Sequence, residues 1–264
     1  MTANNSGDYI NSDFSLIRQI PDVLRARGFR LYLADGKRLT DLWLNGGAAV
    51  LGHTPSGLLR EIKNTASRGL YAPYPHFTEN RFLKALSALF PGRCFRFYAA
   101  PPEEITGFLT DGRAKLWRPF ADAAPPPLFI TVLPGIQTWR GGLPFGLCVI
   151  AAASEDYFIK FPRSDALPPV LSAAAVRGVY DIIAAADRGK LKLPRVFNQL
   201  RNSIWRRQGI YLTLKKEPSG DEWAALFHRF YNAGFLLPPV QSHPLILPGE
   251  ISDGEEVKLA ELLS

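Results

Sequence analysis

The feature that most constrains this chain is a pair of adjacent glycines, Gly141 and Gly142, followed four residues later by an apolar run from Leu147 to Ala151. Glycine adopts the backbone angles of tight turns most readily, so the pair predicts a turn. The apolar run predicts a buried strand directly after it. No lysine occurs between Lys115 and Lys160, so the whole region around this turn lacks a side-chain amine.

The segment from Ile136 to Ile150 resembles a class III pyridoxal-phosphate (PLP) aminotransferase, and more narrowly a glutamate-1-semialdehyde aminomutase. That family carries a lysine, small and apolar residues, a glycine run, Leu-Pro and another glycine, here Gly146. When Gly141 and Gly142 are aligned with the last two glycines of the run, the Schiff-base lysine falls on Gln137. Imine formation needs an amine with a free lone pair, which a carboxamide lacks. The resemblance implies that the covalent chemistry is lost, with Lys115 and Lys160 as displaced candidates.

Other segments also resemble the family, and they follow one another along this chain in the same order as in the family. Asp35-Gly36, a strong hairpin signal between alternating strands, leads to Leu51-Gly52-His53. The turn from Gly234 to Pro238 and the ending from Gly249 to Leu263 resemble the C-terminal part of the aminomutase-like subgroup. A histidine titrates near neutrality, but the resemblance places His53 in the small domain, and we expect a structural role for it.

The family's phosphate site is degenerate in this sequence. The strand from Cys94 to Tyr98 leads to Pro101, Pro102 and Glu103, where the family has Ser-Gly-Thr-Glu-Ala at a helix N-terminus. Backbone N–H groups at such a helix end hold a phosphate, and proline has no N–H to donate. Arg140, beside the glycine pair, is the remaining candidate for an anion contact.

The centre of the family's large domain is missing. Between Arg118 and Leu128 only a short connector rich in alanine and proline is present, where the family has the aromatic residue and the Asp that contact the cofactor ring. Asp122 is the only acid of this interval. Its place in the connector does not suit the role of the ring partner.

Local patterns predict further elements. A loose apolar stripe predicts a helical arm over residues 10–27, and a second stripe predicts a helix over residues 194–208. Asp221 is the expected N-cap of a helix over residues 222–233.

Composition sets broad limits. The 264 residues, 47% of them hydrophobic, predict a globular protein with one or two domains. The net charge of +7 comes from scattered basic residues, so nucleic-acid binding is not expected. Cys94 and Cys148 have no metal-ligand spacing, and no secretory signal or membrane span is present, which predicts a cytoplasmic protein without a metal site.

The predicted fold is α/β, a reduced form of PLP-transferase fold type I. A small α/β domain is expected from both chain ends, residues 1–62 and 209–264, and a truncated large domain from residues 63–208.

The resemblance implies a catalytically silent relative of the aminotransferases that acts as a binding or scaffold subunit, with no cofactor expected. The alternative is a PLP-dependent aminotransferase or aminomutase that uses a displaced lysine. A small module that binds another phosphorylated ligand through Arg140 and the following glycines is a third reading. Because the family is dimeric, a homodimer or a heterodimer with a full-length aminotransferase relative is the expected assembly.

Overall fold

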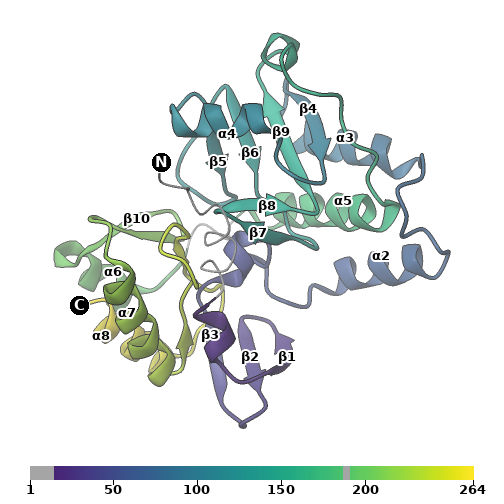
Figure 1. Cartoon of the computed structure of the whole chain (residues 1–264). Coiled ribbons are helices and arrows are strands. Elements are labelled where there is room, and N and C mark those ends of the chain that lie inside the picture. The colour runs from purple at the N-terminus through teal and green to yellow at the C-terminus, as the bar shows by residue number, and fades with distance from the viewer. Residues whose placement is uncertain (1–14, 187–190) are drawn as a thin grey trace, which may run out of the picture.

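The computed structural model describes residues 15–186 and 191–264 and has a mixed α/β architecture. Figure 1 shows a sheet with its helices in the upper right of the view, and the first strands with the C-terminal helices in the lower left. The β7–β8 ribbon lies between these two groups of elements.

The sheet in the upper group has the strand order β4-β9-β6-β5. It consists of β4 (Cys94–Tyr98), β9 (Cys148–Ala152), β6 (Leu128–Thr131) and β5 (Lys115–Trp117). β9 runs antiparallel to both of its neighbours, whereas β5 and β6 are parallel. Every residue of β6 and β9 is buried, which explains why both strands read as continuous apolar runs.

Helices cover both faces of this sheet. On one face, α3 (Thr78–Leu89) and α5 (Pro169–Ala184) contribute Phe82, Leu86 and Val179 to a core with alternate strand residues. α2 (Ser56–Ala66) packs against α5. On the other face, α4 (Glu103–Thr110) and the 3-10 helix η3 (Glu155–Phe158) enclose a second core.

The N-terminal strands form the hairpin that Asp35-Gly36 predicts. β2 (Arg30–Leu33) and β3 (Arg38–Asp41) pair antiparallel, and Gly36 at the turn has φ +82°, so this prediction is confirmed. β1 (Val23–Arg27) extends the sheet on one side, and β12 (Phe235–Leu236) pairs in parallel with β3 on the other. A C-terminal strand thus completes an N-terminal sheet.

The remaining elements are C-terminal. β10 (Trp205–Gln208), β11 (Tyr211–Leu214) and β13 (Leu245–Ile246) form an antiparallel sheet. The helices α6 (Pro194–Gln199), α7 (Gly220–Asn232) and α8 (Asp253–Leu262) complete this part of the chain. One hydrophobic core joins them to the first strands, with Leu31, Leu39, Phe227 and Leu259 among its buried members.

The glycine pair forms the turn of a short ribbon. β7 (Thr138–Arg140) and β8 (Leu143–Phe145) pair antiparallel, with Gly141 and Gly142 between them at φ +55° and +75°. Two consecutive positive φ values are what a type I′ hairpin turn requires. The predicted turn and the buried strand after it are both confirmed.

Three local predictions are wrong in part. Residues 10–14 of the predicted arm lie outside the described residues, and Val23–Arg27 forms a strand because it pairs with β2. The predicted helix over residues 194–208 ends early, since Trp205–Gln208 pairs with β11. Ser219 rather than Asp221 caps α7, because its side chain accepts from the Glu222 N–H in a capping box.

The predicted division at residues 62 and 209 stays a prediction. α2 runs across the first boundary and packs against α5, whereas α6 precedes the second boundary and packs against α8.

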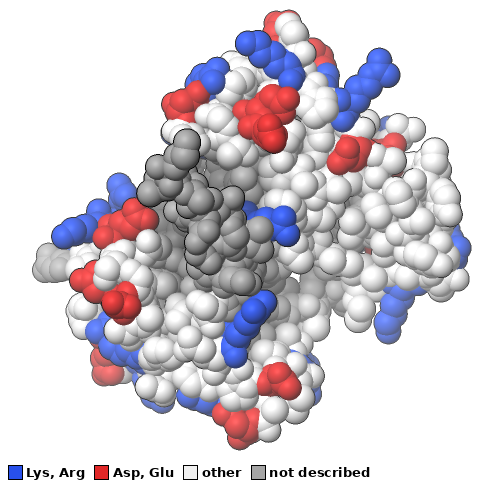
Figure 2. Space-filling view, viewed as in Figure 1, with Lys and Arg blue, Asp and Glu red and all other residues white. Residues whose placement is uncertain are grey.

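No helix in the described part of the chain is long and apolar enough to cross a membrane. In Figure 2, basic and acidic side chains are interspersed over the visible face rather than gathered by sign.

Candidate functional site

Gln137 lies just before β7 and is buried, with 7% of its surface exposed. Its Nε2 donates to the carbonyl oxygen of Leu147 at 2.8 Å, while its Oε1 has no hydrogen-bond partner. The backbone carbonyl of Gln137 accepts from the Asn45 side chain at 3.1 Å. The carboxamide therefore serves to hold the start of β7 against the residue that precedes β9.

The indole of Trp139 fills space close to Gln137. Trp139 is 4% exposed, and its Nε1 donates to the Asn45 carbonyl at 3.0 Å. A Cβ placed on Gly46 would lie 2.6 Å from the indole, so only glycine fits beneath it. The ring also meets His243 edge-on, with centroids 4.7 Å apart. Rings and backbone thus occupy the surroundings of Gln137.

The N-terminus of α4 has the degenerate features that the sequence indicates. Pro102 is the N-cap residue and Pro101 precedes it, so neither position offers an N–H. Glu103 and Glu104 occupy the first turn and are exposed. Their carboxylates favour the positive end of the helix dipole but repel a phosphate at the same place.

The displaced lysines lie apart from Gln137. Lys115 starts β5 and lines a cavity of about 330 Å³, whereas Lys160 follows η3 and lines another of about 310 Å³ with Phe108. Gln137 lines neither cavity. Arg140 is exposed at the end of β7, with its guanidinium 5.2 Å from the centroid of the Phe145 ring.

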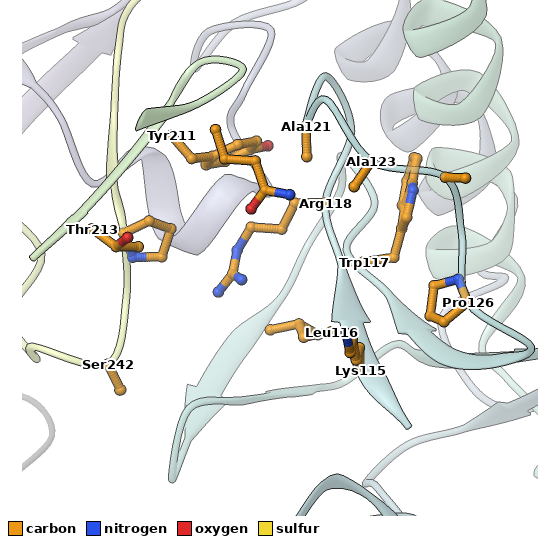
Figure 3. Close-up of a pocket in the computed structure, with 13 residues that line it drawn as sticks. Lys115, Leu116, Trp117, Arg118, Ala121, Ala123, Pro126, Tyr211, Thr213 and Ser242 are labelled. Atoms are coloured by element: carbon orange, nitrogen blue, oxygen red, sulfur yellow. The ribbon is translucent and has the colours of Figure 1, made fainter. Parts of the chain in front are cut away.

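The 330 Å³ cavity lies between β5 with the connector after it and β10–β11 with Ser242 and Pro244. Figure 3 shows Arg118 reaching from the end of β5 toward the side of the cavity formed by Thr213 and Ser242. Lys115 also lines the cavity, and no acid is found among its described lining residues. Arg118 was missed by sequence reasoning; a charged residue directly after an apolar strand is the signal that could have found it.

Close contacts fix the two walls of this cavity. The Gly209 N–H donates to Asp122 Oδ2 at 3.0 Å, and the Tyr211 hydroxyl donates to the Pro119 carbonyl at 2.6 Å. A Cβ on Gly209 would lie 2.0 Å from the Phe120 carbonyl oxygen. Asp122 thus binds a turn of the opposite wall.

Arg118 is partly buried and poorly satisfied. Its Nε donates to the Gly46 carbonyl at 3.4 Å, and among the described residues no carboxylate pairs with it. Burial lowers the pKa of Arg118 to about 10. The guanidinium still carries its charge at neutral pH, in a setting that withdraws water from it.

His243 lies beside this guanidinium. It is 3% exposed, and its Nδ1 accepts from Trp43 Nε1 at 3.1 Å. Its Nε2 has no hydrogen-bond partner. Burial and the charge of Arg118 together lower the pKa of His243 to about 3, so the ring is neutral at physiological pH.

His53 has the structural role that we expected. Its Nε2 lies 2.8 Å from Oδ2 of Asp41, a carboxylate that is 2% exposed. The other oxygen of Asp41 accepts from the N–H groups of Trp43 and Leu44. The described residues contain no group of three or more His, Cys, Asp or Glu side chains that could hold a metal.

Solved structures with the same arrangement are PLP-dependent aminotransferases. Ornithine delta-aminotransferase of Plasmodium falciparum matches with a TM-score of 0.66 and 12% identity, over 92% of this chain and 91% of that chain. An omega-transaminase from Sphaerobacter thermophilus matches with a TM-score of 0.65 and 12% identity, over 92% and 90%. The chain has a shortened aminotransferase fold. At such low identity the likeness establishes the fold alone.

Sequence relatives of this aminotransferase-fold chain are uncharacterized proteins of spirochaetes. One from Treponema pallidum (strain Nichols) is 28% identical, over 88% of this chain and 91% of the relative. One from Borreliella burgdorferi (strain ATCC 35210 / DSM 4680 / CIP 102532 / B31) is 27% identical, over 92% and 90%. No model of a known protein family matches the sequence.

Proposed function

We propose that this chain is a catalytically silent relative of the class III aminotransferases that acts as a binding or scaffold subunit. The buried carboxamide of Gln137, which donates to the Leu147 carbonyl at 2.8 Å, is the observation that carries the proposal. An imine-forming site needs a free amine at this point.

The surrounding residues do not fit a covalently held PLP. The prolines at the start of α4 lack N–H donors, and Glu103 and Glu104 oppose a phosphate there. The Trp139 indole occupies the space above Gly46. Covalent attachment at Gln137, phosphate binding at the start of α4 and room for a ring above Gly46 are each disfavoured.

The alternative is a PLP-dependent aminotransferase or aminomutase that uses a displaced lysine. One observation favours Lys115 over Lys160 in that role, because Lys115 lines the same cavity as Arg118. An arginine in the same cavity could hold the phosphate of the cofactor.

Borohydride trapping separates these two functions. We expect protein incubated with PLP and then reduced to carry no pyridoxyl group on a single lysine, as measured by peptide mass spectrometry. Lys115→Met and Lys160→Met serve as controls for any label at these positions. Stoichiometric labelling of wild-type protein that one of these substitutions abolishes would establish the enzyme instead.

We also propose that the chain assembles as a homodimer, or as a heterodimer with a full-length aminotransferase relative. Support comes from exposed apolar side chains on α2, α5 and the segment between α2 and α3: Leu59, Tyr71, Tyr74, Tyr180 and Ile183. Large apolar side chains exposed on packed elements are a feature of protein interfaces. Unpaired Cys94 and Cys148 support a cytoplasmic location.

Sedimentation velocity tests the assembly. We expect a dimer for the wild-type protein, alone or with the relative, and a monomer for Tyr71→Glu, since Tyr71 is 71% exposed. Leu24→Glu is a matched control, because Leu24 is 72% exposed but lies on β1. A wild-type monomer in both conditions, or equal effects of the two substitutions, would contradict the proposal.

A further inference from the structure

We propose that the cavity beside Arg118 binds a small organic anion, a carboxylate or phosphate joined to an apolar body, with Arg118 as the anion-binding residue and Lys115 as a second cation. The inference gives a ligand class to the binding role proposed above and in that sense rests on it. It concerns residues that the sequence comparison with the aminotransferases did not single out.

The first observation concerns the N–H donors of the Arg118 guanidinium. A guanidinium has five N–H donors, and the Gly46 carbonyl takes one of them at 3.4 Å. Some arginines of the described structure pair with an acid, for example Arg30 with Glu255 and Arg195 with Glu256. Among the described residues Arg118 has no such acid, although its surroundings desolvate it. A desolvated cation without an acid partner is costly unless an anion completes the site.

The His243 ring can report on charge beside Arg118. Trp43 Nε1 can only donate, so Nδ1 of His243 must be the unprotonated acceptor. The proton of the neutral ring therefore resides on Nε2, which is buried. The charge of Arg118 acts on this ring and helps to lower its pKa. His243 does not line the cavity, so an anion bound to Arg118 would change the electrostatic surroundings of the ring without contacting it.

The cavity lining selects the remaining chemistry. Lys115 adds a second cation, and Thr213 and Ser242 add hydroxyls. The part of the lining that the structure describes contains no acid, so it favours negative charge. Trp117 and several alanine and proline side chains supply an apolar part. A volume of about 330 Å³ suits a small organic molecule, and this mixture of apolar walls with few polar groups is typical of ligand sites.

A second large cavity lacks this excess of positive charge. It measures about 500 Å³ and lies near Ser203, but its lysines, Lys215 and Lys216, are balanced by Glu217 and Glu222. Arg140, the anion contact that the sequence suggested, is exposed on the β7–β8 ribbon. The Arg118 cavity therefore combines an excess of positive charge, guanidinium donors without an acid partner among the described residues, and enough volume for a ligand.

Isothermal titration calorimetry of the full chain with phenyl phosphate and with benzoate, at constant ionic strength, tests the proposal. Neither probe can form an imine, so the result is independent of the borohydride experiment. We expect at least one probe to bind, and Arg118→Met to weaken it about 10- to 100-fold, as expected for loss of a charged hydrogen bond. Arg140→Met is the matched control and should leave binding unchanged.

A second measurement needs no substitution at Arg118. The chain has four histidines, so the ¹⁵N imidazole spectrum is simple, and the His243 Nε2–H resonance should move when the probe binds. The probe should also protect Arg118 of wild-type protein from phenylglyoxal. The proposal is wrong if neither probe binds, if Arg140→Met abolishes binding, or if binding leaves both His243 and the reactivity of Arg118 unchanged.

Discussion

The side-chain amide of Gln137 donates to the Leu147 carbonyl at 2.8 Å, within a part of the chain where both residues are buried. This single contact links the segment before β7 to the residue before β9. It also uses the atom at which a lysine amine would have to remain free.

Replacing Gln137 by Lys is expected to leave the protein without transamination activity and without a pyridoxyl label after borohydride reduction. The buried ammonium would have the Leu147 carbonyl but no carboxylate, so the free energy of unfolding should fall by about 2–4 kcal/mol. Urea unfolding measures this loss. Gln137→Met, which adds no charge, should cost less; an active or more stable Lys variant would contradict the geometry.

His243 should make stability depend on pH. Burial and Arg118 lower its pKa from 6.5 to about 3. The unfolded chain therefore takes up a proton below about pH 6.5 while the folded chain does not, so the contribution to stability is full above pH 6.5 and declines as pH falls toward 3. The limiting slope for one proton is about 1.4 kcal/mol per pH unit.

Urea unfolding between neutral pH and mild acid measures this dependence. His243→Gln should flatten the decline, whereas His228→Gln should not, because His228 is exposed. Equal slopes for wild-type protein and His243→Gln would show that His243 is not buried as a neutral ring.

Gly209→Ala should be strongly destabilising. Gly209 has φ +61°, and its new Cβ would lie 2.0 Å from the Phe120 carbonyl oxygen, a backbone atom that cannot move freely. We expect a loss on the order of 3 kcal/mol or more in denaturant unfolding. Gly36→Ala is the matched control with φ +82° and no atom within 4 Å, and it should cost only about 1 kcal/mol. Similar losses at both positions would mean that the wall of the cavity can shift.

Glu255 should link the two chain ends in a pH-dependent way. Burial alone would raise its pKa, but hydrogen bonds from Arg30, Ser252 and Thr40 outweigh burial and lower the pKa to about 2. This stability is present above pH 4.5 and lost as pH falls toward 2. Glu255→Gln should therefore lose on the order of 2 kcal/mol at neutral pH.

The control for Glu255 lies on the same helix. Glu261 is exposed on α8, so Glu261→Gln should leave the free energy of unfolding nearly unchanged. The difference between Glu255→Gln and wild-type protein should shrink in acid. A difference that persists below pH 2 would assign the effect to packing rather than to charge.

The sequence by itself determined the features that depend on a few adjacent residues. Asp35-Gly36 specifies its hairpin and Gly141-Gly142 its turn, because positive φ values are a local property of glycine. The buried strands β6 and β9 can be recognised in the sequence as apolar runs. The lack of an amine at Gln137 likewise follows from the sequence alone, because no tertiary contact turns a carboxamide into an amine.

Only the tertiary structure decided the rest, because it depends on pairing between distant segments. Trp205–Gln208 and Val23–Arg27 carry helix-like spacing, yet both are strands because partner strands satisfy their backbone groups. Arg118 and His243 carry no motif and lie far apart in the sequence. Arg118 becomes part of a cavity when Gly209 and Tyr211 bring β10 and β11 against the segment after β5, and His243 becomes a buried ring in its electrostatic field.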